Sequence, residues 1–131
     1  MHEPAPTLPS VIVRLHGIAF IALGVAFLAR PTEMIAMVDI EATTALARGD
    51  IRAVYGGMEV GLGVALLLAR GSQALAFAAR ALVLLFACMV AARAGSFLAD
   101  GVPADPGPLL LAVEIGGLVT AALAARGLQR P

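Results

Sequence analysis

Long apolar runs separated by short polar segments dominate the pattern of hydrophobic and polar positions in this chain. A helix of about 20 apolar residues is long enough to cross the ~30 Å hydrocarbon core of a bilayer. Runs of this kind predict four transmembrane helices, over residues 11–29, 50–69, 74–98 and 109–125. The alternating period of a β-strand is absent from these runs. Only a helix satisfies all its backbone hydrogen bonds within one segment in lipid.

The links between the runs predict how the helices are connected. Residues 31–48 alternate apolar side chains with Glu33, Asp39 and Glu41, so this link is too charged to span and is expected to contain a short interfacial helix. The other links are a polar turn near Arg70 and a segment rich in proline and glycine at 100–108. Short links favour an up-down-up-down antiparallel bundle. We therefore predict a single all-α integral membrane domain covering residues 1–131.

Composition agrees with a membrane protein and excludes several classes of function. Hydrophobic residues make up 60% of the chain, against roughly 45–50% in ordinary soluble domains. Basic and acidic residues balance at 9 each, which gives no electrostatic reason to bind nucleic acid. Cys88 is the only cysteine, so an internal disulfide and a cysteine metal site are excluded. His16 and His2 complete no cluster of ligands, and we expect neither a metal nor a cofactor.

The distribution of arginine predicts the orientation. Arginines near the ends of spans favour the cytoplasmic side. One side of the predicted bundle holds more of them, namely Arg14, Arg70, Arg126 and Arg130. The other side holds Arg30 and Arg48 among several acids. We therefore expect a protein of the bacterial cytoplasmic membrane with both termini in the cytoplasm.

The second apolar run carries polar residues and glycines at helical spacing. At about 100° per residue, one stripe of the helix holds Arg52, Gly56, Glu59 and Gly63, with Tyr55 beside it. A second seam of small residues holds Gly57, Gly61 and Ala65. Glycines let helix backbones approach closely in lipid. We therefore interpret Gly56, Gly57, Gly61 and Gly63 as helix-packing positions.

Charged residues inside the predicted spans need partners. An arginine or an acid at the centre of a span costs about 2.5–3.5 kcal/mol on insertion scales, so such residues usually face the bundle interior. In the third run Arg93, Ser96 and Asp100 share a face, and the fourth run contains Glu114. In an antiparallel bundle the charged residues of the second, third and fourth runs lie at similar depths. We predict one neutral network, formed by Arg52, Glu59, Arg93 and Glu114 with a hydrogen bond from Tyr55.

The sequence around this stripe resembles a known family. The segment Asp50-Ile-Arg52-Ala-Val-Tyr55-Gly56-Gly57, followed by Glu59 and Gly63, resembles the hallmark of a bacterial membrane family, domain of unknown function 4345. Arg93 with Asp100-Gly101, and Glu114 in the fourth run, resemble its other polar positions. The resemblance implies a small four-helix integral membrane protein with no established activity. The layout is also similar to DoxX-like four-helix proteins, but fold does not imply function.

These observations leave several functions open. The first is an accessory or interaction subunit, or a binder of a small lipophilic molecule, in which the polar network orients the helices or faces a ligand. The alternatives are a proton-coupled or small-solute transporter that uses Glu59, and a membrane enzyme with Glu59 or Glu114 as general base. The bilayer is the expected partner, together with a second copy or another membrane protein. A pocket of a few hundred Å³ beside either acid would favour a ligand site over a purely structural network.

Overall fold

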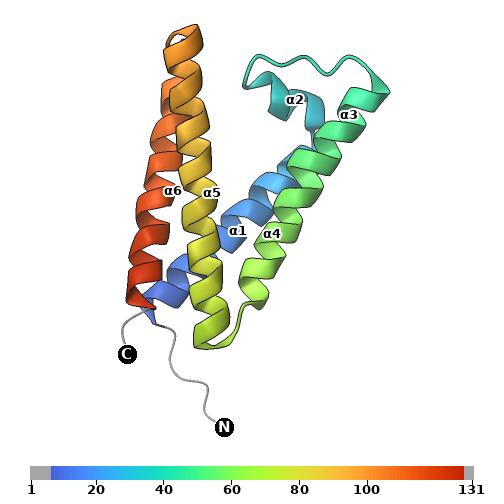
Figure 1. Cartoon of the computed structure of the whole chain (residues 1–131). Coiled ribbons are helices and arrows are strands. Elements are labelled where there is room, and N and C mark those ends of the chain that lie inside the picture. The colour runs from blue at the N-terminus through green and yellow to red at the C-terminus, as the bar shows by residue number, and fades with distance from the viewer. Residues whose placement is uncertain (1–6, 129–131) are drawn as a thin grey trace. The chain divides into compact units, whose positions relative to one another are not determined.

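The computed structural model describes residues 7–128, and every regular element in this part of the chain is a helix (Figure 1). The elements are α1 (Leu8–Ala29), α2 (Pro31–Ala36), α3 (Ala45–Ile51), the π-helical η1 (Arg52–Gly57), α4 (Met58–Leu68), α5 (Gly71–Asp100) and α6 (Gly107–Gly127). Since α3, η1 and α4 follow one another without a break, they form a single long helix over Ala45–Leu68. That helix, α1, α5 and α6 are each long and apolar enough to cross a membrane. The predicted all-α class with four membrane-spanning helices is confirmed.

Close contacts divide the chain into two compact units. The N-terminal unit is Leu15–Leu68, and the C-terminal unit combines residues 69–128 with residues 7–14. Each unit contains a pair of antiparallel helices. The up-down order through all four helices stays a prediction.

In the N-terminal unit, α1 and the η1–α4 helix pack through glycines. A Cβ atom at Gly17 would lie 2.9 Å from the carbonyl oxygen of Gly63, and one at Gly24 would lie 2.7 Å from that of Gly56. As the position on α1 advances, the partner on the other helix moves back by the same number of residues, so the two helices are antiparallel. Because real Cβ atoms do not approach backbone oxygens this closely, the packing requires glycine at these positions.

The link between α1 and α3 holds the short helix α2 and an N-cap. The hydroxyl oxygen of Thr44 accepts a hydrogen bond from the backbone N–H of Ala47 at 3.1 Å. This cap starts the second long helix at Ala45, earlier than the apolar run that begins near Asp50. In α2, Ile35 is buried and packs in a small core with Phe27, Ala42 and Ile51. A position of α2 at the membrane interface stays a prediction.

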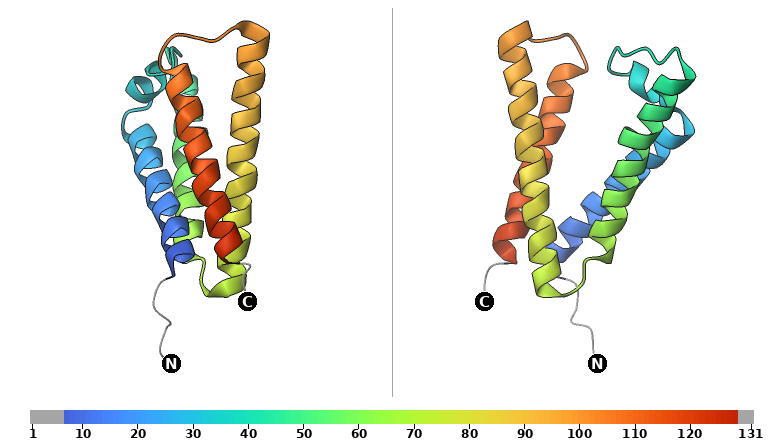
Figure 2. Two further views of the ribbon diagram at one scale, coloured as in Figure 1. Left: turned by 90° about the vertical axis from the view of Figure 1, so that its left-hand side faces the viewer. Right: turned by 45° about the vertical axis from the view of Figure 1, so that its right-hand side comes forward.

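In the C-terminal unit, α5 and α6 form an antiparallel hairpin, in which the two helices run side by side in both views of Figure 2. The ring of Phe86 on α5 lies against Gly117 on α6, where a larger side chain would collide with it. Leu82 and Ala121 are also fully buried. With 30 residues, α5 is about 45 Å long at 1.5 Å per residue, so it exceeds the ~30 Å hydrocarbon thickness and extends beyond it.

Candidate functional site

A buried ion pair joins the two helices of the C-terminal unit. Nε of Arg93 donates to both carboxylate oxygens of Glu114, at 3.0 and 2.9 Å, and Nη2 donates to Oε1 at 2.6 Å. Glu114 is 5% exposed, whereas 30% of the Arg93 side chain remains accessible. The carboxylate is therefore fully engaged, while Nη1 of Arg93 makes no hydrogen bond to any described residue.

The hairpin explains why these two side chains meet. Arg93 lies about two turns before the end of α5, and Glu114 lies about two turns after the start of α6. Because the helices are antiparallel and joined by a short connector, residues 101–106, the two positions fall at the same height. The short connector thus brings together two oppositely charged side chains that are 21 residues apart in the sequence, and they form a neutral pair.

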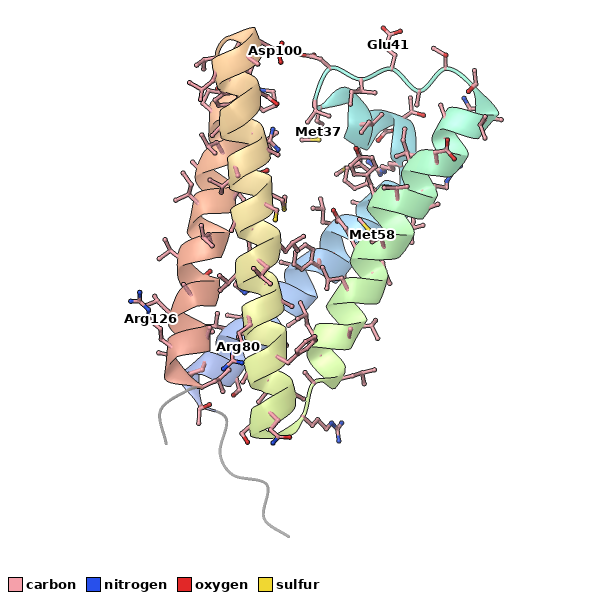
Figure 3. The ribbon with its side chains drawn as sticks, viewed as in Figure 1. Met37, Glu41, Met58, Arg80, Asp100 and Arg126 are labelled. Atoms are coloured by element: carbon pink, nitrogen blue, oxygen red, sulfur yellow. The ribbon has the colours of Figure 1, made fainter. Side chains whose placement is uncertain are left out.

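A pocket opens beside this ion pair. It has a volume of about 610 Å³, within the range of ~300–1,000 Å³ typical of small-molecule sites. All of its lining comes from α5, the connector and α6: Met89, Ala92, Arg93, Ser96, Phe97, Asp100, Gly101, Val102, Pro103 and Glu114. The lining combines apolar side chains with the ion pair, the hydroxyl of Ser96 and a second carboxylate, Asp100. Figure 3 places Asp100 at the end of α5, where the connector begins.

The polar groups of the pocket differ in how many hydrogen bonds and ion pairs they make. The hydroxyl of Ser96 donates to the carbonyl oxygen of Ala92 at 3.1 Å, so its own oxygen can still accept a hydrogen bond. Asp100 makes no ion pair or side-chain hydrogen bond with the described residues. Within residues 7–128, no group of three or more acidic, histidine or cysteine side chains is arranged to hold a metal ion.

The polar residues of the second long helix lie in the other unit and have partners of their own. Nε of Arg52 donates to the carbonyl oxygen of Leu28 at 3.2 Å, in the last turn of α1. The ring of Tyr55 stacks on Phe27, with 5.3 Å between the centroids and 28° between the planes. Arg52 and Tyr55 thus hold the end of α1, a role that we did not predict from the sequence. The carbonyls at the end of a helix need such donors.

Glu59 differs from Glu114 in its surroundings. Its Oε2 atom is buried and has no hydrogen-bond partner among the described residues. Within the N-terminal unit, Arg52 does not form an ion pair with it. The structure therefore brings together Arg93 and Glu114, and it places Arg52, Tyr55 and Glu59 in the N-terminal unit. The network of all five residues stays a prediction.

The glycines of the second long helix also separate into two groups. Gly56 and Gly63 face α1, where added side chains would collide with Leu28 and with Gly17 and Ile21. At Gly57 and Gly61, by contrast, an added Cβ would meet no atom of α1 within 4 Å. The backbone over Arg52–Gly57 is π-helical, with the N–H of Met58 bonded to the carbonyl of Ala53. We did not predict this wider turn, although two adjacent glycines are compatible with it.

Comparison with known protein families shows to which family this chain belongs. The family model described as Domain of unknown function (DUF4345) matches residues 10–125. The chain belongs to the DUF4345 family. The resemblance predicted from the segment around Arg52 and Tyr55 is thereby confirmed. Comparisons with curated proteins and with solved structures give no match.

For this member of the DUF4345 family, the sequence indicated only the polar part of the pocket. Arg93, Ser96 and Asp100 share a helical face, and that spacing was the available signal. Phe97, Val102 and Pro103 gave no comparable signal, because apolar residues and prolines occur throughout the chain. Phe97 lines the pocket from the last turn of α5, and Val102 and Pro103 line it from the connector.

Proposed function

We propose that this DUF4345 protein binds a small amphipathic molecule in the pocket formed by α5, the connector and α6. The observation that supports the proposal is the volume of about 610 Å³ beside a buried, fully hydrogen-bonded ion pair. A network that served only to hold two helices together would need no cavity at its side. A pocket with an apolar wall and a few oriented polar groups is the usual form of a small-molecule site.

The composition of the lining indicates an amphipathic molecule. Met89, Phe97 and Val102 supply apolar surface for a hydrocarbon body. Ser96 and Asp100 supply polar groups toward the end of α5 for a head group. Because the surrounding helices are long enough to span a bilayer, a molecule that partitions into lipid reaches such a pocket at a high local concentration.

The geometry of Glu114 favours binding over catalysis. A general base must reach the proton that it removes. Both oxygens of this carboxylate already accept hydrogen bonds from Arg93, and the side chain is buried. Glu114 is thus better suited to orient Arg93 than to accept a proton from a substrate.

We infer that the protein resides in the bacterial cytoplasmic membrane with both termini in the cytoplasm, as the arginine distribution predicts. It acts there as an accessory or interaction subunit, alone or with a second copy.

Photolabelling of the protein in lipid nanodiscs tests the proposal. The probe is a neutral dodecyl alcohol that carries a diazirine, and the labelled peptides are mapped by mass spectrometry. We expect label to concentrate on the stretch from Met89 to Pro103. Ala92→Leu, which fills the pocket, should reduce that label about tenfold, as expected for a loss of ~1.4 kcal/mol of binding.

Ala91→Leu is the matched control for this experiment. Ala91 is exposed and adjacent in sequence but does not line the pocket, so its replacement should leave the label in place. Labelling spread over all lipid-facing helices, unchanged by Ala92→Leu, would show that the pocket binds no amphiphile.

A further inference from the structure

The pocket carries an unbalanced negative charge. Its charged residues are one arginine and two acids, Arg93, Glu114 and Asp100. Three hydrogen bonds commit Arg93 to Glu114, so these two charges neutralise each other. Asp100 has no cationic partner among the described residues. The remaining charge that an occupant meets is therefore a carboxylate.

The position of Asp100 strengthens this asymmetry. It is the last residue of α5, and Gly101 turns the chain away with a φ of 88°. The C-terminal end of a helix carries a partial negative charge from its free carbonyls and favours cations there. The carboxylate of Asp100 and the negative end of the helix dipole have the same sign, so they repel each other. Both attract a positive group to the rim of the pocket.

Depth along α5 separates the head-group end from the apolar end. At 1.5 Å per residue, Met89 lies about 16 Å below Asp100 along the helix. Phe97, one turn from Asp100, also lines the pocket, and an aromatic ring can contribute to binding a quaternary ammonium group. From Asp100 toward Met89, the lining thus begins with a carboxylate and an aromatic ring, passes the mutually neutralised Arg93–Glu114 pair and ends at an apolar side chain.

We propose that the pocket binds an amphipathic amine, whose cationic head lies at Asp100 and whose hydrocarbon body extends toward Met89. This assignment rests on the proposed function, because it specifies the ligand of the same site. An anionic amphiphile fits less well, since Glu114 already neutralises the charge of the guanidinium and the free carboxylate of Asp100 would repel the anion. A neutral amphiphile would leave the negative charge of Asp100 without a counter-charge.

Competition against the photolabel described above tests the assignment. The competitors are dodecyltrimethylammonium, dodecanoate and dodecanol, which share one alkyl chain and differ in charge. We expect dodecyltrimethylammonium to displace the label at about tenfold lower concentration than the other two, a difference of ~1.4 kcal/mol. Asp100→Asn should remove this preference, so that the three compounds compete at similar concentrations.

Asp105→Asn is the matched control, because Asp105 is an exposed acid of the same connector that does not line the pocket. It removes the same charge from the protein surface, and the preference for the ammonium compound should persist. Equal or stronger competition by dodecanoate, or an equal loss in both variants, would overturn the amine assignment while the pocket still binds amphiphiles. If the label is not concentrated on the pocket and none of the three competes, the proposed function fails as well.

Discussion

Two glutamates on membrane-spanning helices have opposite hydrogen-bonding environments. Glu114 accepts three hydrogen bonds from Arg93, whereas Oε2 of Glu59 is buried without a partner among the described residues. Their positions in the sequence are similar, since each lies in an apolar run with glycines nearby. The difference between them predicts opposite effects of mutation on stability.

Removal of Glu114 should destabilise the C-terminal unit. Glu114→Leu leaves the guanidinium of Arg93 in a partly buried position without its counter-charge, and we expect a loss of about 2 kcal/mol in the free energy of unfolding. Denaturant titration in detergent micelles measures it. The double variant with Arg93→Met removes both charges and should recover part of the loss. A single variant as stable as the native protein would contradict a stabilising role for the pair.

Replacement of Glu59 by an apolar side chain of similar length should be tolerated. Glu59→Met removes a buried oxygen that lacks a hydrogen bond, so we expect a gain of up to about 1 kcal/mol. Glu59→Gln keeps a buried polar group and should gain less. The same titration measures both. A loss comparable with that of Glu114→Leu would indicate that Glu59 has a partner of its own.

At the scale of the elements, glycine contacts decide which face of the second long helix packs on α1. The stripe with Gly56 and Gly63 contacts α1, while Gly57 and Gly61 lie away from it. Both groups follow the same helical spacing, so the sequence could identify two seams but not the one that packs on α1. Arg52 and Tyr55 stabilise the packing of this stripe on α1 through their contacts with Leu28 and Phe27.

Alanine substitutions at two glycines of α4 should therefore have opposite signs. In Gly63→Ala the new Cβ would lie 2.5 Å from the carbonyl oxygen of Gly17, so α1 must shift, and we expect a loss of about 1–3 kcal/mol. In Gly61→Ala the new Cβ meets no atom of the N-terminal unit, and the higher helix propensity of alanine should stabilise by up to about 1 kcal/mol.

Thermal unfolding of the two variants in the same detergent provides the comparison. Because both replace a glycine of one helix by alanine, differences in composition cancel. Equal effects at the two positions would show that α1 does not pack on the stripe with Gly63.

At the scale of the whole molecule, orientation in the membrane is the testable property. The turn before α5 and the end of α6 lie at the same end of the hairpin and carry Arg70 and Arg126. The other end carries Asp100, the last residue of α5, and Asp105 in the connector. Arg130, which also supports this orientation, lies outside the described residues. The positive-inside rule therefore predicts that the connector lies on the outer side.

Cysteine labelling measures this orientation directly. Cys88→Ala removes the native thiol, and single cysteines are introduced at Ser72, in the first turn of α5, or at Ala104, in the connector. In intact bacterial spheroplasts, a membrane-impermeant maleimide should label Ala104→Cys and spare Ser72→Cys. Permeabilised membranes, in which both sites should react, are the control. The reverse pattern in intact spheroplasts would place the termini outside.

The sequence by itself determined the fold class of this protein. The number of spanning helices follows from the length of the apolar runs, because transfer into hydrocarbon depends on each segment alone. The family relationship also came from local residues, in the segment around Arg52 and Tyr55. Small differences in helix bounds arise where a cap such as Thr44 extends a helix beyond its apolar run.

Only the tertiary structure decided which polar residues meet. The partners of Arg52 and Arg93 depend on which helix lies opposite each side chain and at what height, and several pairings were compatible with the same spacing. The structure pairs Arg93 with Glu114, bonds Arg52 to a backbone carbonyl of α1 and forms a pocket from the connector. Such contacts join residues far apart in the chain, whereas the apolar runs that predicted the spans are local.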